Sequence, residues 1–218
     1  MFIKRVMKST IKKIMHGPRK RFYKRLQKKL KNPCPTIISN DCIGGMIYHN
    51  LNLKFMSPTI NLYISKKDFF TFVNNLTDYL NAELKEETNK NKSYPIGTLE
   101  FNNQKISIKF MHYKTFEEAK NKWNERKKRV DFNNIFIILS IPSNLQSDDI
   151  KKFNLISFKN KMLITYENPT NNNNICVNSV FLKNYYSGKI LSYKSKFSTK
   201  RYMDDIDYVK FLNNNTSQ

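Results

Sequence analysis

Apolar runs and amphipathic segments alternate along the chain from residue 36 onward, and this alternation limits the folds that the chain can adopt. The run over 134–139 is nearly all apolar, which is typical of a strand covered on both faces. The segment over 66–82 instead places Phe69, Phe72 and Val73 at helical spacing. Strands and helices that alternate in this way are typical of α/β proteins. We therefore expect an α/β fold with a Rossmann-like mixed sheet flanked by helices.

The remaining elements follow from the same patterns and from turn and capping signals. Asn102-Asn103 predicts a hairpin turn, and Thr115 with Glu118 forms a capping box at the start of a helix. Strands are expected over 36–39, 58–64, 98–101, 105–111, 134–139, 162–166 and 175–182. Helices are expected over 44–51, 66–82 and 116–129, with a short helix beginning at Ser147.

The first 31 residues differ from the rest in charge. They carry thirteen of the 39 basic residues and none of the 17 acidic ones, within a net charge of +22. Gly17-Pro18 predicts a break between two short amphipathic helices, the second with Phe22, Leu26 and Leu30 on one face. We expect three parts: a basic helical extension over 1–33, an α/β domain over 34–190 and a polar tail over 191–218 with a disordered end.

Three interpretations of the extension stay open. A basic amphipathic helix can lie on an anionic membrane surface, it can pack its apolar stripe on the domain, or it can bind nucleic acid. The chain has no aromatic and basic signature of a known RNA-binding module, so nucleic acid ranks last.

Composition points to a cytoplasmic protein. The three cysteines, Cys34, Cys42 and Cys176, are too few for a disulfide scaffold. The N-terminus lacks the apolar run of a secretory signal, and no apolar run is long enough to span a bilayer. We expect a cytoplasmic location, with peripheral attachment to the inner face of the cytoplasmic membrane as a further expectation. No metal-binding motif is present, so no metal ligand is predicted.

The loop from Asn40 to Gly45 joins an expected strand to an expected helix, where backbone N–H groups favour an anion. Asn40, Gly44 and Gly45 are therefore candidate substrate-binding residues. Cys42 is a candidate nucleophile because a helix N-terminus lowers a thiol pKa, although Asp41 beside it opposes this. Cys42 is equally interpretable as a core or site-lining residue. Asp41 is a candidate base or a hydrogen-bond partner of a sugar hydroxyl, or else a turn or N-cap residue.

A second group of candidates surrounds the expected helix over 116–129. His112 follows a strand, where ligand sites of α/β sheets gather, and histidine is a common proton shuttle, so it is a candidate general base. Arg126 and Arg129 share a helix face and suit bidentate phosphate binding, although basic residues in a last turn also complement the helix dipole. Trp123 is interpreted as a core residue.

These residues resemble a bacterial family, the domain of unknown function 1919. The resemblance covers about residues 36–182 and rests on short segments in a fixed order. These segments are Ser39–Gly45, Ser57–Leu62, Tyr94–Gly97, His112–Tyr113 and the pattern Glu118-Ala119-x-x-x-Trp123-x-x-Arg126-x-x-Arg129. One departure is Ile43, which stands where the family usually has an aromatic residue before the glycine pair. The matching His-Tyr pair adds Tyr113 to the candidate substrate-binding residues.

The resemblance implies a role in surface-polysaccharide biosynthesis, in capsule, exopolysaccharide or lipopolysaccharide. We expect a transferase that acts on a sugar or lipid-linked glycan acceptor, with acyl transfer slightly favoured over glycosyl transfer. An acyl-CoA or a nucleotide-sugar would be the donor. In that mechanism the Asn40–Gly45 loop supplies oxyanion-hole donors and His112 acts as base. The alternative is a non-catalytic scaffold that docks a glycan-assembly complex to the membrane through residues 1–31.

Overall fold

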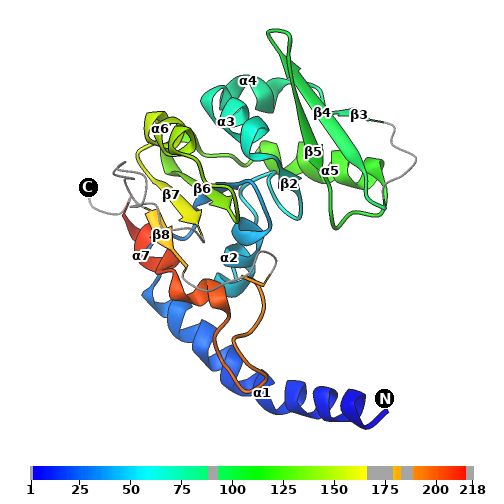
Figure 1. The fold of residues 1–218 in the computed structure, drawn as a ribbon, viewed down its shortest axis with the longest axis vertical. Helices are drawn as coiled ribbons and strands as arrows, with labels where there is room; N and C mark the ends of the chain where they lie inside the picture. The colour runs from blue at the N-terminus through cyan, green and yellow to red at the C-terminus, as the bar shows by residue number, and fades with distance from the viewer. Residues whose placement is uncertain (1, 88–92, 166–178, 183–188, 215–218) are drawn as a thin grey trace.

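The computed structural model describes residues 2–87, 93–165, 179–182 and 189–214 (Figure 1). Its strands form two sheets. The parallel sheet has the order β1-β6-β7-β8 and the antiparallel sheet the order β2-β5-β4-β3. The parallel strands are β1 (Thr36–Ser39), β6 (Ile135–Ile141), β7 (Lys161–Thr165) and β8 (Ser179–Phe181). The antiparallel strands are β2 (Tyr63–Ile64), β3 (Lys85–Glu86), β4 (Ile96–Phe101) and β5 (Gln104–Lys109).

Helices cover both sheets. The α-helices are α1 (Phe2–Lys29), α2 (Ile43–Leu51), α3 (Lys66–Asn74), α4 (Leu76–Asn81), α5 (Phe116–Lys127), α6 (Ser147–Leu155) and α7 (Tyr208–Asn213). Two short 3-10 helices span Phe132–Asn134 and Tyr202–Asp205. The helix expected over 66–82 is thus divided at Asn75, where φ is −128° and the backbone leaves the helical region.

The apolar strand β6 separates two hydrophobic cores. Ile135, Ile137 and Leu139 face a core that includes α3, α5, α6 and the antiparallel sheet. Phe136 and Ile138 face a second core formed with α2, α7 and the second half of α1. Because side chains of a strand alternate between faces, a continuous apolar run serves both cores. The α/β class and the flanking helices are confirmed, and the expected mixture of strand directions is divided between two sheets.

The hairpin of β4 and β5 confirms its prediction. Phe101 pairs with Gln104, and the two residues between them, Asn102 and Asn103, have φ values of 47° and 59°. Asparagine tolerates this left-handed conformation better than other side chains except glycine, and two such residues make the turn that suits a two-residue hairpin. The strand expected over 58–64 is shorter, because buried hydroxyls of Ser57 and Thr59 hold that segment as a loop against β1.

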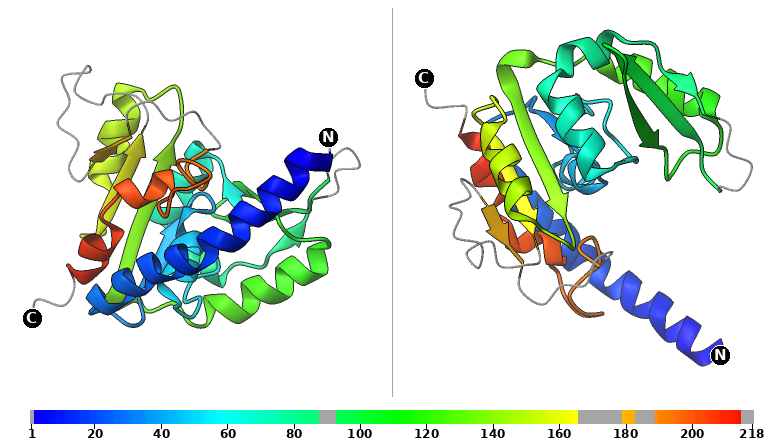
Figure 2. Two further views of the ribbon diagram at one scale, coloured as in Figure 1. Left: turned by 90° about the horizontal axis from the view of Figure 1, so that it is seen from below. Right: turned by 45° about the horizontal axis from the view of Figure 1, so that its top comes forward.

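The predicted break at Gly17-Pro18 is wrong, because α1 continues through Pro18 as one helix of 28 residues. Tertiary contacts on both sides of the proline stabilise the helix across it. Met15 is buried, and Tyr23 donates to Asp204 Oδ2 at 2.9 Å. Such tertiary contacts offset the roughly 3 kcal/mol that a proline costs inside a helix. Figure 1 and the right panel of Figure 2 show the first turns of α1 projecting from the rest of the molecule.

The boundaries expected at 33 and 190 do not separate structural units. Leu26 and Leu30 of α1 pack on the same core as Met203, Ile206 and Leu212 of the expected tail. The sequence pattern hid this because the apolar residues of 203–212 lie between charged ones, on two very short helices. The expectation for the last residues, 215–218, lies outside the described residues. Within the described residues, no helix is long and apolar enough to cross a bilayer.

Candidate functional site

Asn40 joins the ends of three strands. Its side-chain amide donates to the Ser140 carbonyl at 3.0 Å and accepts from the Ser140 N–H at 2.8 Å, which ties β1 to β6. Its own carbonyl accepts from Ile64 N–H at 2.8 Å, which attaches β2 of the other sheet. Asn40 is 2% exposed. Both ends of the Asn40 amide thus have backbone partners, so the structure places this predicted substrate-binding residue in the junction of the strands.

Asp41 lies at this junction of the two sheets and is half-buried. Its Oδ1 accepts from the Ile43 N–H at 2.9 Å, and the Ser140 hydroxyl also donates to its carboxylate. Burial raises the pKa of Asp41 above its usual value, and the two hydrogen bonds offset only part of this effect. Asp41 thus makes the contact of a turn residue, and its raised pKa is compatible with the predicted role as a base.

Cys42 follows Asp41 and is also half-buried. Burial, and then the neighbouring Asp41 charge, raise the pKa of the Cys42 thiol to about 11. The sequence offered a lowered thiol pKa from the helix N-terminus, opposed by Asp41; burial and the Asp41 charge instead raise this pKa. Since the thiolate is the nucleophilic form, Cys42 does not fit a nucleophile at neutral pH.

The glycine pair serves packing. A Cβ on Gly44 would lie 2.5 Å from Ser39 Oγ, so glycine allows α2 to approach β1 closely. The Gly44 N–H donates to Ser39 Oγ at 3.2 Å, and the Ile43 N–H is taken by Asp41. The backbone donors of Ile43 and Gly44 thus have partners inside the loop, which removes them as the expected oxyanion hole. Gly45 faces Ile60, and a Cβ on Gly45 would lie 3.4 Å from Ile60 Cγ2.

Tyr113 and Arg126 form a buried pair beside the same loop. Arg126 Nη1 donates to the Tyr113 hydroxyl at 2.7 Å, and that hydroxyl donates to the Ile60 carbonyl at 3.2 Å. The Arg126 guanidinium also lies 5.0 Å from the centroid of the Phe55 ring. Burial raises the Tyr113 pKa, whereas the Arg126 charge lowers it. These contacts hold the segment over 55–60 against α5, so the expected substrate-binding side chains are used to position a loop.

Arg129 and His112 lie outside that pair. Arg129 Nη1 donates to the Phe55 carbonyl at 3.0 Å, and its Nη2 pairs with Glu125. Arg129 therefore also holds the loop and is not free to bind a ligand phosphate. His112 is exposed on the turn after β5. Among the described residues it has no hydrogen-bond partner, so the structure does not join it to Asp41.

The junction brings the two groups of predicted residues to opposite sides of one loop. Gly45 packs on Ile60 from the side of α2, and Tyr113 binds the Ile60 carbonyl from the side of α5. Tyr63 of β2 lies close enough to Asp41 for that charge to raise its phenol pKa, after the larger effect of burial. The Asp41 carboxyl of this junction is partly exposed to solvent, and its pKa is raised.

Sequence reasoning missed Ser140, whose hydroxyl binds Asp41. The signal was available, because Ser140 is the polar residue inside the apolar run Ile135–Ile141. It also missed the roles of His16 and His49, which line a cavity between α1 and α2. No local signal marks these two histidines, because they meet only when α1 docks on the domain. Trp123, predicted to be core, is 1% exposed and confirmed as such.

The fold and this junction define an α/β protein of two sheets with a carboxylate at the carboxyl end of its first parallel strand. The chain belongs to the family described as Domain of unknown function (DUF1919), whose model matches residues 13–213. It is 36% identical over 197 residues to an uncharacterized protein of Haemophilus influenzae strain Rd, a match covering 89% of this chain and 93% of that protein. The resemblance seen in the sequence is confirmed as family membership. The matched range includes the second half of α1 and residues 191–213, which the sequence had placed outside the domain.

Proposed function

We propose that the protein is a transferase of surface-polysaccharide assembly that acts on a sugar hydroxyl, with Asp41 as the base. The observation that carries the proposal is the Asp41 carboxylate. It is half-buried at the carboxyl end of a parallel strand, with a raised pKa that favours proton acceptance. The surface-glycan context rests on the resemblance described above.

In this reaction the acceptor hydroxyl gives its proton to Asp41 while its oxygen attacks the transferred group. With a nucleotide-sugar donor, a bond forms from that oxygen to the anomeric carbon, and the bond from this carbon to the diphosphate oxygen breaks. The diphosphate leaves with the electron pair. Ser140 is a positioning residue, because its hydroxyl holds the carboxylate and does not itself reach the acceptor in this scheme.

Glycosyl transfer now takes precedence over acyl transfer. Acyl transfer was favoured because the Asn40–Gly45 loop would supply oxyanion-hole donors. The N–H groups of Ile43 and Gly44 already have acceptors, and the Cys42 thiol is protonated at neutral pH. A glycosyl transfer needs neither an oxyanion hole nor a nucleophilic thiol.

The test compares cells that carry the wild-type gene, Asp41→Asn or Asp78→Asn in a deletion background. Asparagine at 41 keeps an oxygen that can accept from Ile43 but cannot take a proton. Asp78 is exposed on α4 and serves as the matched control. We expect the surface polysaccharide to lack one defined group in Asp41→Asn cells and to be complete in Asp78→Asn cells. Mass spectrometry of the purified glycan identifies the missing group as sugar or acyl. A complete glycan in Asp41→Asn cells would refute Asp41 as the base.

The scaffold alternative is supported by one observation, the projecting first half of α1 (Figure 1). That half carries Lys4, Arg5, Lys8, Lys12 and Lys13 and no acidic residue. A scaffold would bind anionic vesicles through these charges, with affinity falling as salt rises. The effect of a scaffold on the glycan would survive Asp41→Asn but would be lost when these five residues are replaced by glutamine. A transferase would instead lose turnover in a soluble assay with Asp41→Asn and keep it with the five glutamines.

A further inference from the structure

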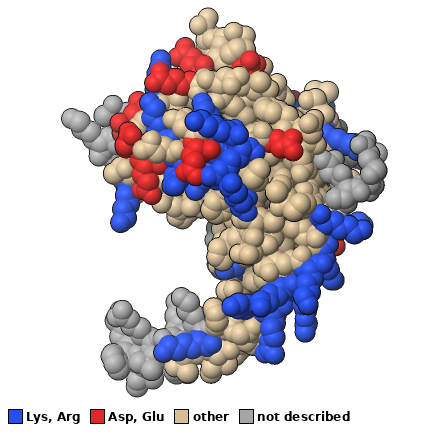
Figure 3. All heavy atoms as spheres, turned by 180° about the vertical axis from the view of Figure 1, so that it is seen from behind, with Lys and Arg blue, Asp and Glu red and all other residues tan. Residues whose placement is uncertain are grey.

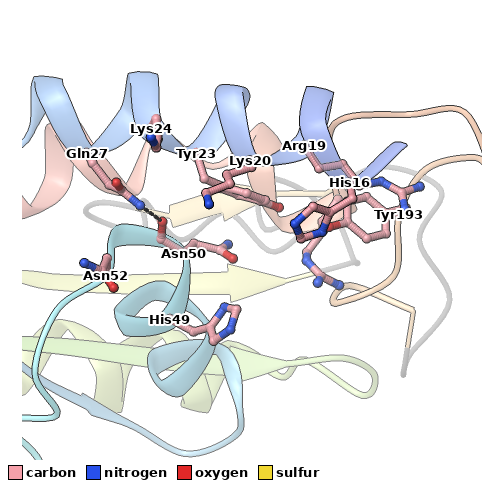
Figure 4. A pocket seen from close by; sticks show the side chains of 11 residues that line it. His16, Arg19, Lys20, Tyr23, Lys24, Gln27, His49, Asn50, Asn52 and Tyr193 are labelled. Carbon is pink, nitrogen blue, oxygen red and sulfur yellow. Dashed lines mark hydrogen bonds between the residues drawn. The ribbon is translucent and has the colours of Figure 1, made fainter. Parts of the chain in front are cut away.

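A cavity of about 540 Å³ lies between α1, the end of α2 and the segment over 193–201 (Figure 4). His16 and Lys20 come from α1, His49 from α2 and Tyr193 from the C-terminal segment. Asp41 precedes α2, whereas His49 and Asn52 lie at the other end of this nine-residue helix. At 1.5 Å per residue the two places are separated by roughly 13 Å along the helix. The cavity is therefore a separate place from the Asp41 junction.

The lining of the cavity is basic. Six of its side chains are lysine, arginine or histidine, and no lining residue is acidic. These six are His16, Arg19, Lys20, Lys24, His49 and Arg201. Among the described residues, no ion pair neutralises Arg19, Lys20, Lys24 or Arg201. Figure 3 shows mostly basic side chains on the lower part of the molecule, where α1 lies, whereas the upper part carries both basic and acidic side chains. A concave surface lined by one sign of charge concentrates ions of the other sign.

Two guanidinium groups meet at one aromatic ring. Arg19 lies 3.6 Å and Arg201 lies 4.3 Å from the centroid of the Tyr193 ring. Arg201 Nε is buried and has no hydrogen-bond partner. Backbone carbonyls already accept from both groups: Arg19 donates to the Ser198 and Lys196 carbonyls at 3.0 and 2.9 Å, and Arg201 Nη1 donates to the Leu191 carbonyl. Two cations this close still repel each other, and an anion in the cavity would reduce that repulsion.

Asp204 is an acid that interacts with Arg201 of the cavity, but several other donors share its carboxylate. Its carboxylate already accepts from Tyr23 Oη at 2.9 Å, Tyr208 Oη at 3.1 Å and the Arg201 N–H at 2.6 Å. Burial raises its pKa, which favours the uncharged form. The Asp204 cluster therefore fixes α1 on the C-terminal segment, and Lys20 and Lys24 of the cavity have no acidic partner among the described residues.

We propose that this cavity binds a ligand that carries a diphosphate group. The cavity is too large for one phosphate, and its volume lies in the range of small-molecule sites. Its basic side chains extend from His16 to Lys24, about 12 Å along α1, which suits an extended anion. Arginine and lysine bind phosphate by charge-assisted hydrogen bonds. This site is independent of the Asp41 proposal, because none of its residues belongs to the junction.

The test is calorimetric titration of the full chain in about 150 mM salt with inorganic pyrophosphate, uridine diphosphate and farnesyl diphosphate. Two double variants on α1 are compared. Lys20→Gln/Lys24→Gln removes two lining charges, and Arg21→Gln/Lys28→Gln removes two exposed charges outside the cavity. Both change the net charge equally, and none of the four side chains has a described tertiary contact that folding needs.

We expect saturable binding at one site, weakened about tenfold or more in the first variant and less than about twofold in the second. Tenfold corresponds to about 1.4 kcal/mol. Tighter binding of uridine diphosphate would identify a nucleotide-linked ligand, and tighter binding of farnesyl diphosphate a lipid-linked one. The proposal is overturned if the wild type binds none of the three, or if both variants weaken binding equally. This test measures binding at the cavity and the Asp41 test measures the glycan, so either proposal can fail without affecting the other.

Discussion

Gly44 is the position where the addition of one methyl group should have the largest effect on the junction. We expect Gly44→Ala to destabilise the fold by about 1–3 kcal/mol, because the new Cβ would lie 2.5 Å from Ser39 Oγ. Gly45→Ala is the matched control. Its Cβ would lie 3.4 Å from the nearest atom, and alanine gains up to about 1 kcal/mol of helix propensity over glycine. Denaturant unfolding monitored by circular dichroism measures both, and equal effects would contradict the described packing of α2 on β1.

Cys42 should react slowly with alkylating reagents at neutral pH. In a chain with Cys34→Ser and Cys176→Ser, Cys42 is the remaining thiol. Its pKa of about 11 predicts an iodoacetamide rate that still rises about tenfold per pH unit between pH 7 and 9. Since Asp41 contributes to the raised pKa, Asp41→Asn should increase the rate at any pH in this range. A rate that levels off below pH 9 would show that the thiol is activated after all.

Residue types were predictable at this site, but their partners were not. Asp41 was expected as a base or turn residue; it has the contact of a turn residue, and its role as a base stays a prediction. Asn40 was expected to face a ligand, and it instead joins β1 to β6, because its neighbour in space, Ser140, is a hundred residues away in sequence. A side chain that bonds to a distant backbone leaves no local pattern.

At the scale of elements, Pro18 should limit the stability of the first half of α1. We expect Pro18→Ala to slow amide hydrogen exchange at residues 10–17 by about tenfold to 100-fold, because it adds a helical N–H donor and removes a clash worth about 3 kcal/mol. Arg21→Ala, exposed on the same helix, should leave this exchange nearly unchanged. If Pro18→Ala has no effect, the helix does not continue through residue 18 in solution.

Elements defined by local patterns were predictable. Strand β1 was placed correctly, and the Asn102-Asn103 turn was found from residue type alone. The Thr115 cap was also found, since its hydroxyl accepts from the Glu118 N–H at 3.2 Å. The continuation of α1 and the short helix α7 depend on packing across the molecule, and local propensity opposed the first and was too weak for the second.

At the scale of the whole molecule, removing only the first turns of α1 should affect stability far less than removing the whole helix. Met15, Arg19, Tyr23 and Leu26 of α1 contact the rest of the molecule. Deleting residues 2–9 should change the melting temperature by no more than about 3 °C. Deleting residues 2–31 should lower it by about 10 °C or more, because it exposes the core that Leu26 and Leu30 cover and frees Asp204 from Tyr23. Differential scanning fluorimetry compares the two, and equal melting temperatures would show that the 1–33 extension is separate, as its charge suggested.

The division into two sheets was the feature of the whole molecule that the sequence could not predict. Strand directions were consistent with one mixed sheet, and only the pairing of β2 with β5 assigns that short strand to the second sheet. The basic cavity shares this origin. Its residues come from α1, α2 and 193–201, and each group alone reads as a solvated charge run or a polar loop.

The joining of the two ends of the chain also sets an order of events during synthesis. The Asn213 side chain donates to the Lys29 carbonyl at 3.0 Å and accepts from the Lys31 N–H at 2.8 Å, so the helix made first is completed by residues made last. At ribosomal speeds of about 5–20 residues per second, α1 waits on the order of ten to forty seconds for these partners. During that time the residues over 193–201, which complete the cavity, are not yet packed beside the lysines and arginines of α1. A nascent chain therefore presents these basic residues to chaperones and polyanions before the C-terminal segment can pack on them.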